Sequence, residues 1–245
     1  MIEYYPIDLP GKSLYTIPFN IEIRKVTPLE VKYAFSLFQK QQLSPDEYLD
    51  FLKKFIRFDN QEMTAEKLFW FDFKYILYQI RYKTFKNYPI KLHFTCSNEE
   101  CGKEFVHELD IGALQILEPS DIQDFSTKIE LDNLGRVDIR NKTVGDDAII
   151  YEFAKSKDID LTSIDNLVFL ADLAAISNVY SLEELYKFAE EGTLTAEDIL
   201  KIEDWLAKTI WGFKEEIMIK CPICGKEEPR QYILSLGDYF SVDRS

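Results

Sequence analysis

The chain contains four cysteines, which occur as two short pairs far apart in the sequence. Cys96 and Cys101 form a C-x4-C pair, Cys221 and Cys224 form a C-x2-C pair, and 119 residues separate the two pairs. Four thiolates at such spacings are typical ligands of a closed tetrahedral zinc site. We therefore predict one structural Zn²⁺ bound by all four cysteines, which would join the middle of the chain to its end.

The surroundings of both pairs are those of a hairpin tip. Gly102 and Gly225 follow the second cysteine of each pair, where a tight turn often needs a positive φ. Apolar or alternating segments flank the pairs, at residues 90–95 and 104–109 for the first and 217–220 and 231–236 for the second. Each pair is therefore predicted to lie at the tip of a β-hairpin and to form a metal knuckle there.

Other uses of the cysteines fit less well. A disulfide framework needs an oxidising compartment, whereas the opening MIEYYPIDLPGK lacks the charged and apolar regions of a signal peptide. A redox Cys-x-x-Cys would involve one pair only, and a catalytic zinc would need an open ligand position. His93 and His107 lie in the segments that flank the first pair, and we expect them at the surface or behind the ligands rather than on the metal.

The composition predicts a folded chain with a large core and an acidic surface. Of the 245 residues 46% are hydrophobic, and no apolar run reaches the length of a membrane span, so we expect a soluble protein of a reducing cytosol or of a particle assembled there. Some of the 18 Phe and 14 Tyr are expected at contacts with partners. The net charge of −14 disfavours nucleic-acid binding, which depends on Lys and Arg. The first half nevertheless carries a small basic cluster at Lys74, Arg81, Lys83, Lys86 and Lys91.

Capping motifs and apolar periodicity predict mainly helices. Helices are expected to begin after Thr27, Ser44, Thr143, Ser181 and Thr195. Two strongly apolar helices are expected at about residues 64–85 and 164–179, and the last capped helix is expected to end near Gly212. The first 18 residues are expected to be a loop, residues 19–26 a strand, and residues 128–132 and 136–140 a hairpin.

These elements predict an α+β, mainly helical fold. Two β-hairpin zinc knuckles would form a four-cysteine zinc ribbon that is interrupted by a helical insertion. The expected divisions are an N-terminal loop and strand (1–26), a helical region (27–88), a split zinc ribbon (89–110 and 214–245) and an inserted hairpin and helical domain (111–213).

The motifs of the common enzyme classes are missing from the sequence. It contains no Gly-x-Ser-x-Gly, no Walker lysine loop and no Gly-x-Gly-x-x-Gly. Acidic pairs such as Asp146-Asp147 and Glu203-Asp204 carry little weight in a chain with 43 acidic residues, and Asp146 is explained as a first-turn acid that complements a helix dipole. We therefore predict no catalytic residues and no enzymatic activity.

Several motifs occur in an order that resembles a known family. They are Thr27-Pro28-Leu29-Glu30, then Ile80 to Phe85 (IRYKTF), the Ile129 to Asp147 hairpin and helix start, Cys221 to Gly225, and Tyr239-Phe240. Over about residues 9–240 the chain resembles the baseplate proteins of T4-type contractile-tailed bacteriophages, a family that includes hub subunits and hub-assembly factors.

The resemblance implies an architectural role. Such a protein would be assembled in the host cytoplasm as a structural or assembly component of the virion tail baseplate, in its hub or wedge region. Its partners would be other hub or wedge proteins and the tape-measure protein, with no membrane and no nucleic acid. The alternative is a zinc-ribbon adaptor protein of transcription or nucleic-acid machinery, which would bind through the basic cluster. A metal-dependent enzyme, the third class, would need an open ligand position.

Overall fold

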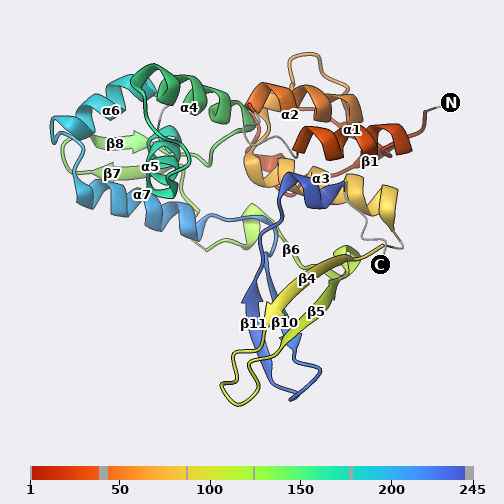
Figure 1. The fold of residues 1–245 in the computed structure, drawn as a ribbon. Coiled ribbons are helices and arrows are strands. Elements are labelled where there is room, and N and C mark those ends of the chain that lie inside the picture. The colour runs from red at the N-terminus through yellow and green to blue at the C-terminus, as the bar shows by residue number, and fades with distance from the viewer. Residues whose placement is uncertain (1, 39–43, 87, 124, 177–178, 241–245) are drawn as a thin grey trace.

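The computed structural model describes residues 2–38, 44–86, 88–123, 125–176 and 179–240. They form an α+β fold with seven α-helices, one three-stranded sheet and four two-stranded sheets among the described residues. Figure 1 shows two groups of helices side by side, with two long β-hairpins projecting away from one of them. None of the described helices combines the length and the apolar character needed to cross a membrane.

The first hydrophobic core is built around one helix that is apolar on several faces. Its elements are β1 (Tyr4–Ile7), α1 (Pro28–Phe38), β2 (Ile21–Arg24), α2 (Pro45–Leu52), β3 (Ile56–Phe58) and α3 (Trp70–Phe85). Phe73, Leu77 and Ile80 of α3 are buried as predicted, whereas Trp70 is only half-buried. The helix begins later than expected because residues 65–67 form a separate 3-10 turn.

The antiparallel sheet of this core corrects one expectation. Residues 4–7 were expected to be loop, yet they pair with β2 from Tyr4↔Arg24 to Ile7↔Ile21. The strand was not predicted because it contains Pro6, which is unfavourable in most strands. A proline is tolerated on an edge strand such as β1, because the missing N–H of an edge residue need not face a neighbour.

The second hydrophobic core contains one hairpin and four helices. They are β7 (Lys128–Leu131), β8 (Gly135–Asp138), α4 (Val144–Lys157), α5 (Ile164–Ala175), α6 (Leu182–Glu190) and α7 (Ala196–Lys208). Helix α5 ends at Ala175, whereas the sequence predicted an end at 179. Two residues of the predicted extension, 177 and 178, lie outside the described residues. Helix α7 ends at Lys208 rather than near Gly212, with Thr209 as its C-cap. The chain then turns at Gly212, with φ 89°, into strand β9 (Gly212–Phe213).

The predicted helix starts are confirmed at atomic detail. At Ser44, Ser181 and Thr195 the cap side chain and the acidic residue three positions on bond each other's backbone N–H groups. At Thr143 the backbone N–H donates to the Asp146 carboxylate, and the Asp146 N–H donates to the Thr143 carbonyl. Thr27 and Glu30 exchange the same two bonds ahead of α1. These bonds satisfy N–H groups that a helix start leaves free, which is why a local motif predicted them correctly.

The two cores meet at the start of α4. The Val144 N–H donates to the Leu68 carbonyl at 2.9 Å, and the Trp70 N–H donates to the Lys142 carbonyl at 3.0 Å. The Tyr48 hydroxyl of α2 also donates to the Asp147 carboxylate at 3.0 Å. The helical region of the second core therefore docks on the first through backbone bonds as well as side chains.

The projecting hairpins consist of β4 (Ile90–Thr95) with β5 (Glu104–Leu109), and of β10 (Glu216–Lys220) with β11 (Glu227–Gln231). The first hairpin is as predicted. In the second, the returning strand is 227–231 rather than 231–236, because the short cysteine turn lets pairing begin at Lys220↔Glu227. The apolar positions 232, 234 and 236 that suggested a strand instead pack against the first core.

Candidate metal centre

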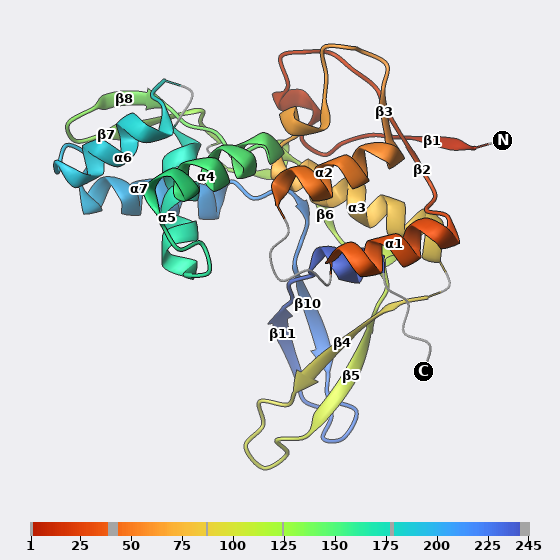
Figure 2. The same ribbon diagram turned by 45° about the horizontal axis from the view of Figure 1, so that its top comes forward.

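The turns of the two hairpins lie at their far end, away from both helical groups (Figure 2). The four cysteines lie in or beside these turns, close to one another. Cys96 directly follows β4 and Cys221 directly follows β10, so each hairpin brings one cysteine at the end of a strand and one in its turn. Cys96 and Cys221 are buried, Cys101 is half-buried and Cys224 is exposed. Two segments separated by 119 residues therefore meet at one point, as the sequence predicted.

The sulfur positions fit one tetrahedral metal ion. All four Sγ atoms lie within 4.8 Å of one another, and no other His, Cys, Asp or Glu of the described residues joins the group. The Cys96 and Cys224 sulfurs are 3.6 Å apart, and the Cys101 and Cys221 sulfurs are 3.9 Å apart. Tetrahedral ligands at the usual zinc–sulfur bond length are separated by roughly 3.8 Å. The thiols are free, and the two spacings far exceed the bond of about 2.05 Å in a disulfide.

The turns point backbone N–H groups at the sulfurs. Cys96, Cys101 and Cys224 each accept a hydrogen bond from the amide two residues further on, at Asn98, Lys103 and Lys226. Gly102 and Gly225 have φ values of 53° and 77°, as predicted from their positions. Such amides stabilise thiolate charge, which is the form of cysteine that binds a metal.

The sulfurs influence each other's ionisation. The Lys226 N–H lowers the pKa of the Cys224 thiol, and with the neighbouring thiols it brings that pKa to about 7. The Asn98 N–H lowers the pKa of the Cys96 thiol, but burial and the neighbouring thiols outweigh it and raise that pKa to about 12. A cation among the sulfurs would favour their thiolate forms.

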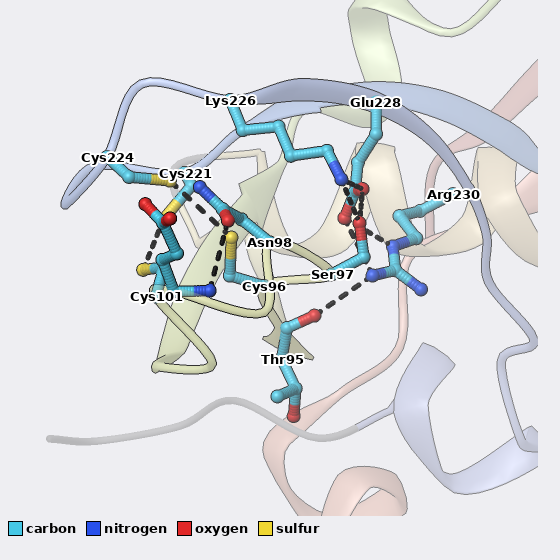
Figure 3. Close-up of polar contacts among 11 residues, drawn as sticks. Thr95, Cys96, Ser97, Asn98, Cys101, Cys221, Cys224, Lys226, Glu228 and Arg230 are labelled. Atoms are coloured by element: carbon cyan, nitrogen blue, oxygen red, sulfur yellow. Dashed lines mark hydrogen bonds and ion pairs between the residues drawn. The ribbon is translucent and has the colours of Figure 1, made fainter.

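A polar clasp, formed by Ser97, Lys226, Glu228 and Arg230, joins the two hairpins beside the sulfurs (Figure 3). Ser97 donates to the Glu228 carboxylate, and Lys226 donates to the Ser97 hydroxyl at 2.6 Å. Arg230 donates to Glu228 at 2.6 Å and to the Thr95 carbonyl of the other hairpin at 3.0 Å. The Ser97 hydroxyl, followed by Arg230, lowers the pKa of Glu228 to about 2, so this carboxylate is ionised at neutral pH.

Sequence reasoning missed the clasp because its members lie on two segments whose contact no local pattern reveals. The sequence feature that could have suggested it is the alternation of Lys226, Glu228 and Arg230, which places Glu228 and Arg230 on one face of β11 and Lys226 just before it. That face is the half-buried one at Glu228 and Arg230, and it is turned toward the first hairpin.

Neither histidine belongs to the sulfur cluster. His93 is exposed on β4, and the half-buried ring of His107 lies 6.4 Å from the ring of Phe94. The acidic pairs also have structural partners. Asp146 accepts two bonds from Arg140, at 2.6 and 3.0 Å, in addition to its capping role, and Asp147 pairs with Lys142 at 2.6 Å.

The basic cluster does not form one exposed patch. Arg81 is buried and donates to the Asp238 carbonyl at 2.7 Å, and Lys74 pairs with Glu215 at 2.9 Å. Both side chains therefore bind the C-terminal part of the chain. Two of the five basic residues that a nucleic-acid adaptor would use to bind phosphates are therefore occupied within the protein.

A buried carboxylate holds the base of the second hairpin in place, and the sequence argument missed it. Asp72, fully buried in α3, accepts from the Gly11 N–H at 2.8 Å, the Tyr15 hydroxyl at 2.8 Å and the Trp211 Nε1–H at 3.1 Å. Burial raises the pKa of Asp72, and these three donors oppose that shift. Trp211 leads into β9, which pairs with β6 (Ile116–Leu117) just before β10 begins. Asp72 is the one acidic residue of α3, and this was the available hint.

A family model described as T4 bacteriophage base plate protein matches residues 14–241. The matched range contains both hydrophobic cores almost completely, both hairpins and all four cysteines. No curated protein and no solved structure matches the chain.

Proposed function

Because the chain belongs to the T4 bacteriophage base plate protein family, we propose that it is a structural or assembly component of the hub or wedge region of a contractile phage tail baseplate. Family membership itself indicates a baseplate component located in the virion tail, with other baseplate proteins as partners and a non-enzymatic role. Hub or wedge proteins and the tape-measure protein are the partners we propose, with assembly in the host cytoplasm.

We further propose that one structural Zn²⁺, bound by Cys96, Cys101, Cys221 and Cys224, fastens the two hairpins into a split zinc ribbon. The observation that supports this is the approach of four free sulfurs to within 4.8 Å of one another from segments 119 residues apart. Four thiolates favour zinc over calcium or magnesium, which take oxygen ligands. When bound, the ion would supply cross-linking and not catalysis, because four protein ligands leave no open position.

The free energies allow this role. Closing a loop of this length costs about 4–5 kcal/mol of chain entropy. A structural zinc site contributes on the order of 10–16 kcal/mol in small peptides. The metal can therefore hold the hairpins together even if little else does, and the ribbon can project from the body without a large core of its own. The divisions 1–26, 27–88, 89–110 with 214–245, and 111–213 remain proposals, and within the third of them Tyr232, Tyr239 and Phe240 belong to the first hydrophobic core.

Metal analysis tests the zinc proposal. Freshly reduced protein, purified without added metal, should contain one zinc per chain and should show no rapid reaction with a thiol reagent until a strong chelator is added. Cys221→Ser should lose the zinc, while Ile223→Ser, which changes an exposed residue of the same turn, should keep it. A reduced wild-type preparation without bound metal would contradict the proposal.

Genetic removal tests the baseplate proposal. In a phage that carries this gene, an amber mutation should give lysates without complete baseplates in electron micrographs, and the wild-type gene on a plasmid should restore them. Mass spectrometry of purified tails then separates the two roles: a resident component is found there, whereas an assembly factor is required but missing. Normal infectious particles formed without the protein would refute both roles.

A further inference from the structure

Helix α5 carries an apolar ridge that the second core does not cover. The ridge consists of Ile164, Leu167 and Val168, at the spacing i, i+3 and i+4 that places side chains on one helix face. Ile164, Leu167 and Val168 are 73%, 41% and 46% exposed, while Leu170 and Leu173 on the opposite side of the helix are buried. An amphipathic helix normally buries one face, and α5 presents apolar side chains on a second.

The ridge has acidic surroundings. No Lys or Arg occurs between Asp158 and Tyr186, a stretch that contains six acidic residues. Asp165 is exposed beside Ile164, and Asp160 lies at the start of the helix, where its carbonyl accepts from Asn166 at 2.9 Å.

The first core carries a groove of opposite charge. It lies between α1 and α2, has a volume of about 560 Å³, and is lined by Leu29, Tyr33, Phe51, Lys32 and Lys54. Leu29 and Tyr33 are 77% and 53% exposed, and the ammonium of Lys54 lies 5.3 Å from the centre of the Tyr33 ring.

The charge of the groove is basic. Neither Lys32 nor Lys54 has an ion-pair partner within the described ranges. The Glu30 carboxylate at the groove edge is already neutralised by Arg24, at 2.6 Å. An apolar helix with acidic flanks is the shape and charge that such a groove would bind.

We propose that α5 of one copy of this chain docks in the α1–α2 groove of a second copy. The ridge and the groove match in apolar character and are opposite in charge. Both ribbon views place α5 and α1 at opposite ends of the molecule, so one chain cannot satisfy its own groove (Figure 1, Figure 2). This inference does not depend on the metal or on the proposed place in the baseplate.

The contact has a direction. Ridge and groove are different surfaces, so each chain that binds through one keeps the other free, and association continues head to tail into a ring or an open chain. A single helix in a groove buries less area than a standard interface, so we expect association in the range of about 10–100 µM.

Sedimentation velocity on the full chain, over about 5–300 µM, tests the proposal. Wild type should form species larger than a dimer. The ridge variant, Ile164→Glu with Leu167→Glu, and the groove variant, Leu29→Glu with Tyr33→Glu, should each weaken association by about tenfold or more. Leu200→Glu places one glutamate at an exposed apolar residue of α7 outside the ridge and should associate like wild type. Far-UV circular dichroism and thermal melting verify that every variant is folded.

Mixing the two variants gives the sharpest result. Each retains one intact surface, so an equimolar mixture should form a one-to-one heterodimer and nothing larger. The proposal is overturned if wild type remains monomeric at the highest concentration, if either variant associates like wild type, or if the mixture gives no heterodimer. Lys32→Glu with Lys54→Glu should weaken association more at 50 mM than at 500 mM salt if charge contributes as argued.

Discussion

Replacing Gly11 by alanine should strongly destabilise the protein. A Cβ atom at this position would lie 2.5 Å from the Asp72 Oδ2 atom and 2.5 Å from Trp211 Nε1. Asp72 and Trp211 are both buried, and the Trp211 Nε1–H donates a hydrogen bond to Asp72 Oδ1. The backbone at Gly11 has φ −84°, which alanine adopts without strain, so the cost comes from the contacts alone.

The expected loss of unfolding free energy follows from two effects. Forcing a methyl group into a packed site costs about 1–3 kcal/mol. Pushing Asp72 away from the Gly11 N–H or from Trp211 removes one hydrogen bond to a buried carboxylate, which costs about 1.5–3 kcal/mol. Their sum, about 2.5–6 kcal/mol, corresponds to a decrease in Tm of roughly 5–20 °C for a chain of this size.

Urea unfolding followed by tryptophan fluorescence measures this loss, because the buried Trp211 ring is itself part of the site. The matched control is Lys12→Ala, which removes an exposed side chain from the same loop and should change the free energy by less than about 0.5 kcal/mol. If Gly11→Ala is as stable as the control, the Asp72 carboxylate does not hold the N-terminal loop to the segment around Trp211.

Removing the proposed metal, by a strong chelator or by Cys221→Ser, should lower Tm by about 10–20 °C in thermal melts, because the unfolded chain regains about 4–5 kcal/mol of loop-closure entropy. Ile223→Ser should melt like wild type. A chelated sample with unchanged Tm would refute the proposal that a metal fastens the two hairpins. Glu228→Gln should break the polar clasp and speed the transfer of zinc to a competing chelator several-fold. Glu227→Gln loses only a bond to Lys220 within its own hairpin and should not speed it. Equal rates of zinc loss from the two variants would show that the clasp does not support the metal centre. Burial, followed by the charge of Glu203, raises the pKa of Asp172 to about 7. A raised acid pKa stabilises the fold below the unfolded pKa of 3.8, and that stability is lost as pH rises through about 7. Asp172→Asn should therefore gain about 1–3 kcal/mol relative to wild type at pH 8 compared with pH 4 in urea melts, and parallel pH profiles would contradict this assignment.

The site illustrates how far local patterns extend. The Cys-Gly turns, their positive φ values and the first hairpin followed from residues within a few positions of each cysteine. The second hairpin was misplaced on its returning side, because alternation at 231–236 looked like a strand but serves the first core. Hydrophobic alternation indicates that one side of a segment is buried without indicating what covers it.

The charges show the same limit. The basic cluster was visible in the sequence, but its two most informative members bind the C-terminal part of the chain, Arg81 through the Asp238 carbonyl and Lys74 through Glu215. Asp72 looked like one acid among many, and only the approach of Gly11, Tyr15 and Trp211 makes it a structural centre.

The sequence by itself determined the helix starts, the cysteine turns and the mainly helical character, because capping bonds and tight turns are made between residues close along the chain. Tertiary structure alone decided that the two cysteine turns meet, that a polar clasp lies beside them, that a buried carboxylate ties three segments together, and that α5 keeps an apolar face uncovered. These contacts depend on which surfaces far apart in the sequence are buried against each other. The packing of all core residues together determines that, and no single segment does.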